Sequence, residues 1–192
     1  MSRFWWVRHG PTHARGFVGW SDVPADLSDH AALSRLRARL PAGAVIVSSD
    51  LRRCVATAEA LGGTLAAQIP ELREMRFGAW ELRRHDEISA ETPELARDFW
   101  TTPGDVRPPG GESWNDLSAR VGAAVDRLAA AHPDRDIVAV AHFGVILTQV
   151  QRARAITAHA ALAQHIAPLS LTRIARDGAG WRLIGVNEGG LP

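Results

Sequence analysis

Residues 4–10 read FWWVRHG, an apolar run that ends abruptly at His9 and Gly10. Residues 137–144 read IVAVAHFG and break off in the same way at His142. Short apolar runs bounded by turn residues are typical of buried strands. Open α/β sheets bind their ligands outside the carboxyl ends of the strands. The two histidines therefore predict a functional site at one edge of a sheet.

Strand patterns recur along the chain and alternate with helical patterns. Strands are predicted at 4–8, 44–48, 65–69, 136–141, 169–175 and 181–186, the last two as a hairpin around Asp177-Gly178. Helices are predicted at 29–39 behind an N-cap at Ser28, and at 51–61, 86–99, 112–131, 145–152 and 155–164. The alternation predicts one layered α/β domain over 1–192 with a mainly parallel sheet. The exceptions are a loop at 10–27 and an irregular insertion at 70–111, rich in proline and glycine.

Composition narrows the class of protein. The formal net charge is +1, so no global field attracts nucleic acid or an anionic membrane. All 22 basic residues are arginines, and codon bias explains this excess. Selection for anion binding can apply to only a few of them. The one cysteine, Cys54, excludes an intrachain disulfide and a cysteine-based metal cluster. Neither a signal peptide nor a membrane span is recognisable, so we expect a cytoplasmic protein.

His9 has the chemistry of a nucleophile. A neutral imidazole can attack phosphorus and form a phosphohistidine. A neighbouring cation such as Arg8 or Arg53 keeps the ring neutral and neutralises the phosphate oxygens. Gly10 would let the backbone approach a ligand closely. A lone histidine at a strand end is more often structural, and it is the Arg-His-Gly context that favours the functional interpretation.

His142 has the same two interpretations, as a hydrogen-bond donor to phosphate or as a structural cap of the sheet. The helix expected after Phe143 and Gly144 would also attract an anion to its N-terminus. Arg52 and Arg53 are adjacent, so on a helix they point about 100° apart and only one faces the site.

Glu74 is the candidate proton donor, because a carboxyl beside a phosphate dianion has a raised pKa. The alternative is a surface acid paired with Arg73 or Arg76. Glu112 lies at a predicted helix start, where a surface acid favoured by the helix dipole is the default. His13 and His85 are weak substrate-pocket candidates. The remaining histidines are expected in surface or packing positions: His30, His132, His159 and His165.

Metal catalysis is the main rival chemistry. The sequence has eight histidines but no His-Glu-x-x-His, no His-x-His pair and no cluster of aspartates. It also lacks a Gly-x-x-x-x-Gly-Lys loop and a Gly-x-Ser-x-Gly elbow. We therefore expect neither a metal nor another cofactor.

Taken together, these motifs resemble the histidine phosphatase superfamily, in the branch related to cofactor-dependent phosphoglycerate mutase. The resemblance is carried, in order, by RHGPT at 8–12, SDLRRC with Thr57-Ala58 at 49–58, Glu74 with FGAWE at 77–81, PGGES at 109–113 and Ala141-His142. It covers almost the whole chain. It implies a three-layer α/β/α sandwich, phosphate binding by Arg53 rather than Arg52, and no metal.

The resemblance also implies roles for individual residues. The implied catalytic set is His9, Glu74, Arg8, Arg53 and His142. Substrate contacts are expected from Thr12, Arg15, Glu112, Ser113 and Phe143. The chain departs from the common pattern in having Pro11 for glutamate, Leu82 for glycine, Arg15 for asparagine and Phe143 for glycine. None of these departures removes a catalytic group, but the last two bear on phosphate and substrate contacts.

The expected function is metal-independent hydrolysis of a small-molecule phosphate ester through phospho-His9. The short chain argues against a phosphoglycerate mutase, which remains one alternative; a non-catalytic phosphate-binding protein is the other. Short family members with these motifs are often alpha-ribazole phosphatase-like, which implies a phosphate of the cobalamin nucleotide loop as a substrate. We expect a monomer or homodimer without a nucleic-acid or membrane partner.

Overall fold

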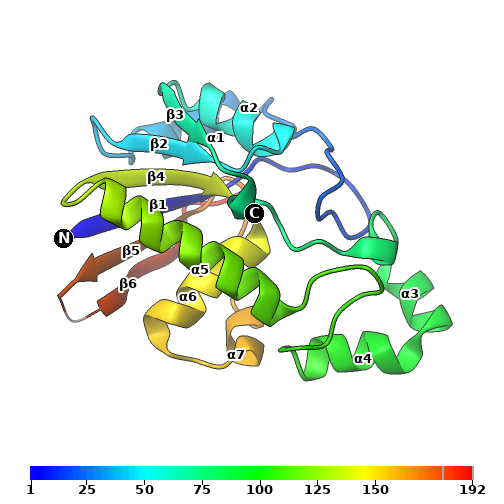
Figure 1. Cartoon of the computed structure of the whole chain (residues 1–192). Helices are drawn as coiled ribbons and strands as arrows, with labels where there is room; N and C mark the ends of the chain where they lie inside the picture. The colour runs from blue at the N-terminus through cyan, green and yellow to red at the C-terminus, as the bar shows by residue number, and fades with distance from the viewer. Residues whose placement is uncertain (179, 192) are drawn as a thin grey trace.

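The fold is built on one six-stranded sheet, seen in a computed structural model that describes residues 1–178 and 180–191 (Figure 1). The strand order is β3-β2-β4-β1-β5-β6. Four neighbouring strands are parallel: β3 (Leu65–Gln68), β2 (Val45–Ser48), β4 (Asp136–Ala141) and β1 (Ser2–Arg8). β5 (Leu171–Asp177) and β6 (Gly180–Glu188) run antiparallel at the other edge. The mainly parallel sheet is confirmed, with an antiparallel hairpin appended.

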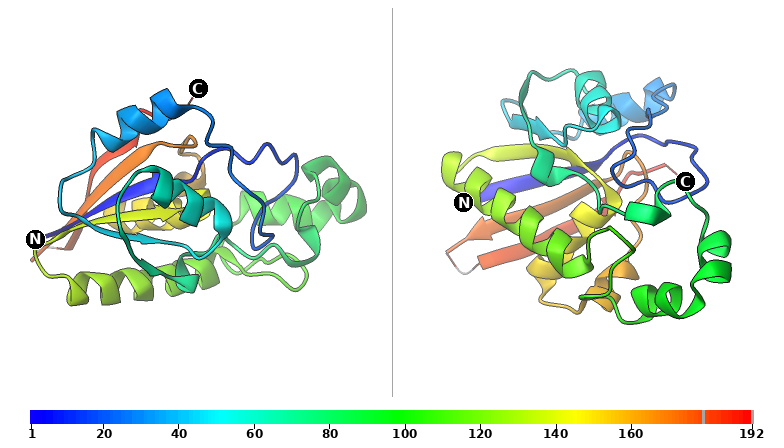
Figure 2. Two further views of the ribbon diagram at one scale, coloured as in Figure 1. Left: turned by 90° about the horizontal axis from the view of Figure 1, so that it is seen from above. Right: turned by 45° about the vertical axis from the view of Figure 1, so that its right-hand side comes forward.

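Helices cover both faces of the sheet, so the chain has three layers (Figure 2). α1 (His30–Arg37) and α2 (Arg52–Ala60) lie on one face, and α5 (Trp114–Ala131) and α6 (Phe143–Arg154) lie on the other. α7 (Ala158–Leu162) packs beside α6. The α/β/α sandwich expected from the resemblance is confirmed.

Alternation along the two central strands explains the layering. Phe4 and Trp6 of β1 join the core under α5 and α6, whereas Val7 joins the core under α1 and α2. In β4, Ile137 and Ala139 face the first core and Val138 and Val140 face the second, in each case with almost no exposed surface. A strand covered on both faces needs a continuous apolar sequence, and that is the pattern in these two strands.

The insertion at 70–111 contains two short 3₁₀ turns, Pro70–Leu72 and Gly78–Trp80, followed by two helices. These helices are α3 (His85–Glu91) and α4 (Pro93–Thr101), where one helix was predicted. The prediction was wrong because Pro93 begins a new helix at its first position, where its missing N–H costs nothing. α3 and α4 project beyond the carboxyl ends of β1 and β4 (Figure 1). Aromatic rings tie them to the body, including Phe17 on Trp100 at 5.7 Å and Trp80 on Phe99 at 5.3 Å.

Two helix starts differ from the prediction. The N-cap of α1 is Asp29, whose carboxylate accepts from the Ala32 amide at 2.8 Å, and not Ser28. α5 begins at Trp114 behind Ser113, so Glu112 precedes the helix. Ser113 and Asp116 form a reciprocal capping box. This motif favours a helix start more strongly than Glu112, the residue at which the sequence predicted the start. The other predicted elements are present with ends shifted by a few residues. In the part of the chain described, no helix is long and apolar enough to cross a membrane.

Candidate active site

The carboxyl ends of β1 and β4 bring His9 and His142 together. The strands pair in register from Arg3 with Asp136 to Arg8 with Ala141, and the His9 amide then donates to the Ala141 carbonyl at 3.0 Å. The two imidazole centroids lie 5.1 Å apart, with the ring planes at 64°. The shared sheet edge expected from the sequence is therefore occupied by both histidines.

The hydrogen bonds of His9 fix which nitrogen is free. Its Nδ1 lies 2.7 Å from the Gly10 carbonyl oxygen, which can only accept. In the neutral ring Nδ1 therefore carries the proton, and the lone pair is on Nε2. Burial and the positive charge of Arg53 lower the pKa of His9 to about 3. The ring is thus neutral, with an unprotonated Nε2, across the physiological pH range.

His142 has the opposite tautomer. Arg53 donates from Nε to its Nδ1 at 3.3 Å, and because a guanidinium cannot accept, that nitrogen must hold a lone pair. The ring proton is therefore on Nε2. Burial and the Arg53 charge hold the pKa of His142 well below its usual value. The Sγ atom of Cys54 lies 3.4 Å from Nε2 and packs against this ring.

Arg8 and Arg53 place two positive charges at the site. Arg53 is fully buried and donates to the carbonyls of Gly19 at 2.7 Å and Ser21 at 3.0 Å. Arg8 donates to the Ile166 carbonyl at 2.5 Å, and its buried Nε has no hydrogen-bond partner among the described residues. Burial lowers the pKa of each guanidinium. Thirteen ion pairs occur in the described part of the chain, and neither arginine belongs to one.

Glu74 lies in the same electrostatic environment. It is 7% exposed, and its carboxylate accepts from the amides of Met75 at 2.9 Å and Gly144 at 3.0 Å. These amides and the charges of Arg53 and Arg8 favour the ionised form, but burial outweighs them and raises the pKa of Glu74. Gly144 is required by packing, because a Cβ there would lie 2.5 Å from the Glu74 carboxylate. The first turn of α6 therefore binds a carboxylate of this chain.

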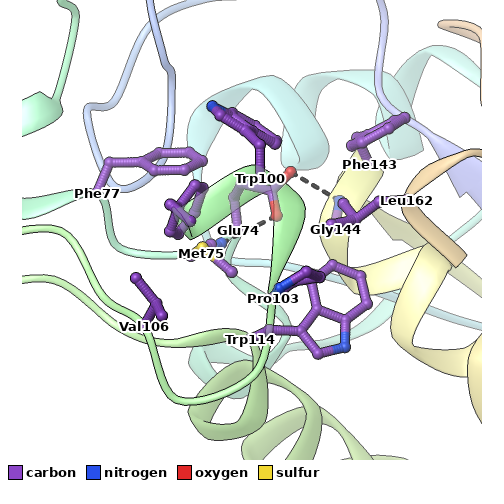
Figure 3. A pocket seen from close by; sticks show the side chains of 11 residues that line it. Glu74, Met75, Phe77, Trp100, Pro103, Val106, Trp114, Phe143, Gly144 and Leu162 are labelled. Atoms are coloured by element: carbon purple, nitrogen blue, oxygen red, sulfur yellow. Dashed lines mark hydrogen bonds between the residues drawn. The ribbon is translucent and has the colours of Figure 1, made fainter. Parts of the chain in front are cut away.

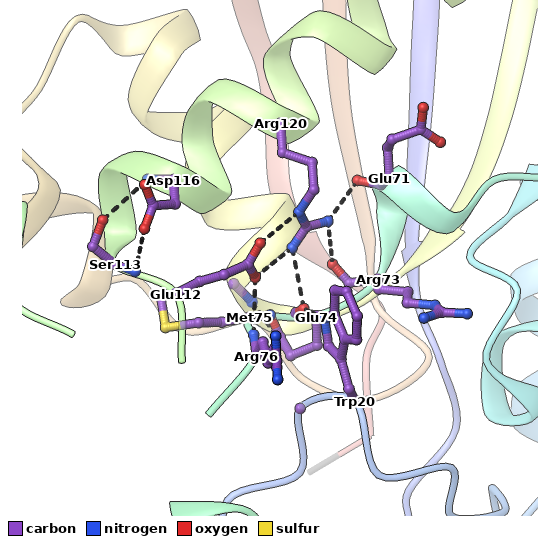
Figure 4. Close-up of polar contacts among 12 residues, drawn as sticks. Trp20, Glu71, Arg73, Glu74, Met75, Arg76, Glu112, Ser113, Asp116 and Arg120 are labelled. Atoms are coloured by element: carbon purple, nitrogen blue, oxygen red, sulfur yellow. Dashed lines mark hydrogen bonds and ion pairs between the residues drawn. The ribbon is translucent and has the colours of Figure 1, made fainter. Parts of the chain in front are cut away.

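Arg120 of α5 holds the segment that carries Glu74 (Figure 4). Its guanidinium donates to the carbonyls of Glu71, Arg73 and Glu74 at 2.8–3.3 Å. It also makes a two-point ion pair with Glu112 at 2.8–2.9 Å. The Glu112 carboxylate in turn accepts from the Arg76 amide at 2.9 Å. The sequence interpretation of Glu112 as a surface acid was wrong, because its side chain is only 18% exposed and paired.

Glu81 fixes the loop that covers Arg53. Its carboxylate accepts from the amides of Gly19, Trp20 and Ser21 at 2.8–3.2 Å and from the Ser21 hydroxyl at 2.7 Å. The Trp20 indole donates to the Glu74 carbonyl at 2.9 Å. Gly19 approaches so closely that a Cβ would lie 2.1 Å from the Met75 carbonyl oxygen. These contacts orient the two carbonyls that accept from the guanidinium.

The predicted substrate-binding residues are scattered around this centre. Thr12 is half-buried and Arg15 is exposed, both in the loop between β1 and α1. Ser113 is fully buried, and its hydroxyl caps α5 by accepting from Asp116. Phe143 lies under the Arg8 guanidinium, 5.4 Å from its carbon, and lines a cavity beside Glu74. Phe143 is thus the member of this set that touches both a site arginine and a cavity.

The structure also bears on what the sequence predicted for the Arg52–Arg53 pair and for Gly10. Arg52 is exposed and Arg53 is buried, so only one of the pair points inward, as their helical spacing predicts, and it is the one that the resemblance implied. Gly10 is required by packing within the chain, because a Cβ there would lie 2.6 Å from Leu27 and 2.9 Å from the Asp26 carbonyl; its close approach to a ligand stays a prediction.

Among the weak histidine candidates, His13 is exposed and binds Asp26 at 2.8 Å. His85 is exposed at the start of α3.

Sequence analysis missed Arg120, the function of Glu81 and the contact of Cys54 with His142. Arg120 borders the apolar face of α5, next to Val121, and no local signal distinguishes it from a solvated arginine. Glu81 is the last residue of the motif at 77–81. The motif singled out this segment, but it did not show that Glu81 binds the loop at 19–21. Among the described residues, no three histidine, cysteine or carboxylate side chains are grouped so as to hold a metal ion.

Comparisons with known proteins agree with this fold. The family model of the histidine phosphatase superfamily, branch 1, matches residues 4–189. The solved structure of a putative alpha-ribazole-5'-P phosphatase from Escherichia coli superposes with a TM-score of 0.86 at 26% identity, covering 100% of this chain and 98% of that one.

Two curated relatives carry different substrate names. A glucosyl-3-phosphoglycerate phosphatase of Mycobacterium tuberculosis is 40% identical over 113 residues, which cover 53% of this chain and 50% of that protein. The chain thus matches half the length of this relative. An adenosylcobalamin/alpha-ribazole phosphatase of Salmonella typhimurium is 31% identical over 159 residues, covering 78% of each. Both names describe phosphatases.

The low pKa of His9 predicts a loss of stability in acid. The pKa of a histidine is near 6.5 in the unfolded chain and about 3 for His9 in the native protein. Between these two pH values the unfolded chain therefore binds one more proton than the native protein does. The free energy of unfolding should therefore fall by up to about 1.4 kcal/mol per pH unit from this residue as the pH drops from 6.5 towards 4. Above pH 7 the contribution vanishes. Denaturant titrations across this range measure the slope.

His9→Gln should reduce that slope by about one proton. The matched control is His30→Gln, at an exposed position on the opposite side of the fold from α5. An unchanged slope in His9→Gln would contradict the neutral, buried state of the ring.

The Arg120 contacts predict a second stability effect. Arg120→Met removes the ion pair of Glu112 and one donor from each of three carbonyls; Glu112 keeps only the Arg76 amide and the Glu74 carbonyl keeps only the Trp20 indole. The free energy of unfolding should therefore fall by roughly 3 kcal/mol. Arg127→Met is the control on the same helix, because its pair with Glu71 is largely exposed and should contribute less than about 1 kcal/mol. Equal losses in the two variants would refute the structural importance of Arg120.

Proposed function

Since the chain belongs to branch 1 of the histidine phosphatase superfamily, we propose that it is a phosphatase that hydrolyses a small-molecule phosphate monoester through a phosphohistidine on His9. The observation that carries the proposal is the free Nε2 of a neutral imidazole beside the guanidinium groups of Arg53, which is fully buried, and Arg8, which is half-buried. Among the described residues neither arginine forms an ion pair with a carboxylate. A phosphate dianion supplies the missing negative charge. The phosphatase names of the relatives support hydrolysis over transfer between two positions of one substrate.

The first step forms a bond from His9 Nε2 to phosphorus as the bond to the ester oxygen breaks. The bond from Nδ1 to the Gly10 carbonyl orients the ring and stabilises the positive charge that develops on it. A protonated nucleophile would have no lone pair to offer, and the low pKa of His9 prevents this. The same neighbouring charge, on Arg53, both lowers that pKa and attracts the phosphate.

Arg8, Arg53 and His142 bind the phosphoryl oxygens in this proposal. The buried Nε of Arg8 has no acceptor among the described residues, and buried polar groups are otherwise nearly always hydrogen-bonded. In the proposal a phosphoryl oxygen is that acceptor. His142 offers the Nε2 proton that its tautomer requires. Donors that are fixed before the reaction stabilise the charge of the transition state without a cost of reorganisation.

Glu74 protonates the leaving oxygen. Its raised pKa favours the protonated form that a general acid needs, and a bound phosphate dianion raises that pKa further by like-charge repulsion. The alcohol leaves with this proton. A water molecule then attacks phospho-His9 and returns a proton to Glu74 as the nitrogen–phosphorus bond breaks, which restores the enzyme and releases inorganic phosphate. No metal takes part in either step.

Covalent labelling tests the nucleophile. Alkaline quenching in detergent after reaction with a monoester radiolabelled in the phosphoryl group, in buffer that contains a chelator, should trap a base-stable phosphoenzyme in the native protein, and later acid treatment should release the label. His9→Ala should abolish both this label and turnover, whereas His13→Ala, on the exposed part of the loop, should leave them intact. Labelled His9→Ala protein would overturn the assignment.

Phosphate release distinguishes the hydrolase from a mutase in the same assay. We expect one phosphate released for each ester consumed, with no need for a bisphosphate primer. Interconversion of 3- and 2-phosphoglycerate faster than phosphate release would show a mutase instead.

Leaving-group dependence tests Glu74. Glu74→Gln should slow the hydrolysis of alkyl phosphates by about 10²–10⁴-fold, since a poor leaving group needs a proton from a general acid. Activated aryl phosphates should lose far less. The comparison uses kcat/KM for an alkyl phosphate and for 4-nitrophenyl phosphate, with Glu71→Gln, at a nearby partly exposed acid, as the control. Equal losses on both substrates would remove Glu74 as the acid.

A further inference from the structure

A small apolar cavity of about 50 Å³ opens directly beside Glu74 (Figure 3). The Glu74 carboxyl lies among the side chains that surround the cavity, bonded to Gly144 on one side. Its walls come from the segment after β3, from α4 and the residues that follow it, and from α5, α6 and α7. The aromatic and aliphatic side chains that form most of the wall are those of Phe77, Trp100, Val106, Trp114, Phe143 and Leu162.

The lining provides no group that would bind a second charge on the substrate. Glu74 is the one charged residue among those that line the cavity in the described structure, and no cation is among them. The Trp114 indole N–H is already bonded to Gln151 at 2.6 Å, and the Gly144 amide is bonded to Glu74. A carboxylate placed here would lose its hydration without a counter-charge and would also be repelled by Glu74 when that group is ionised.

Phe143 joins this cavity to the phosphate-binding side of the site. It follows His142 directly and stacks on Arg8, with the guanidinium carbon 5.4 Å from the ring centroid. It also lines the cavity. A leaving group attached to a phosphate on Arg8 therefore lies against the Phe143 ring. Glycine, the common residue at this position, would leave that wall open.

The size of the cavity limits what enters it. An apolar cavity of about 150 Å³ encloses benzene, so about a third of that volume holds the first carbons of a leaving group but not a whole ring. Phe77, Trp100 and Phe143 are half-buried and form the exposed rim. A larger apolar group would enter edge first and lie between these side chains.

The geometry points to an uncharged alcohol, with an apolar ring or branched alkyl group next to the ester oxygen, as the leaving group of the reaction. This inference rests on the proposed hydrolase function and narrows its substrate class. The cavity selects against leaving groups that carry a carboxylate, such as phosphoglycerates. Phe143 and Trp100 are the residues that determine the preference.

Three primary alkyl phosphates test the inference on the full-length enzyme: benzyl phosphate, glycerol 3-phosphate and 3-phosphoglycerate. Their ester oxygens are all of the primary alkyl type, so a difference in kcat/KM reports the remainder of the leaving group. We expect benzyl phosphate to be preferred over 3-phosphoglycerate by about 10²-fold and over glycerol 3-phosphate by about tenfold or more.

Phe143→Gly and Trp100→Ala should each reduce the ratio of kcat/KM for benzyl phosphate to that for 3-phosphoglycerate by about tenfold. The ratio is the informative quantity because a change in phosphate binding affects both substrates equally. Trp100 lines the cavity from α4, so Trp100→Ala repeats the test without changing Phe143, the ring that stacks on Arg8. Ile184→Ala, on the exposed face of β6, is the control that should keep the ratio.

A higher kcat/KM for 3-phosphoglycerate than for benzyl phosphate in the wild type would overturn the inference and leave the hydrolase intact. An unchanged ratio in both cavity variants would do the same. Absence of hydrolysis and of a phosphoenzyme with every monoester would instead overturn the proposed function, and this inference with it.

Discussion

The hydrogen bond from the His9 amide to the Ala141 carbonyl continues the pairing of β1 and β4 beyond the end of β1. Every other feature of the site depends on that register. It brings the rings of His9 and His142 to 5.1 Å, and it allows Arg53 to donate to one ring while its charge lowers the pKa of both. A slip of one residue would turn every side chain of β1 to the opposite face. The slip would be costly because it would move the large Phe4 and Trp6 side chains into the core that now holds Val7.

The second constraint is the buried positive charge of Arg53, which forms no ion pair with a carboxylate in the described part of the chain. Burial of a guanidinium is costly unless its donors are satisfied. Arg53 meets this requirement through two backbone carbonyls of the loop at 19–21, and that loop is held by four hydrogen bonds to Glu81. The charge of Arg53 is therefore not neutralised by a contact, and it remains available to an anion. As a consequence, the folded protein without a bound anion is less stable than it would be with an apolar side chain at position 53.

The chemistry and the substrate preference arise in different parts of the chain. The nucleophile and the arginines belong to the sheet edge and α2, where strand register fixes them. The cavity beside Glu74 is built mainly by the insertion, α4 and the first residues of α6. Glu74 lies at the boundary, because its carboxylate binds the amide of Gly144 while Arg120 holds its backbone from α5. Changes in the insertion can therefore alter the leaving group without moving the groups that transfer the phosphoryl unit.

The sequence by itself determined the strands, the layering and the two histidines, because these follow from apolar runs and from residues adjacent along the chain. Their helical spacing, which is local, also showed that only one of Arg52 and Arg53 faces the site, whereas the choice of Arg53 came from the family resemblance. Only the tertiary structure decided how Glu74 is held, because Arg120 and Gly144 are 46 and 70 residues away from it. It also decided the tautomers of His9 and His142, which depend on which atoms face each ring nitrogen. The apolar cavity likewise exists only where five segments meet, and no periodicity within one segment encodes such a meeting.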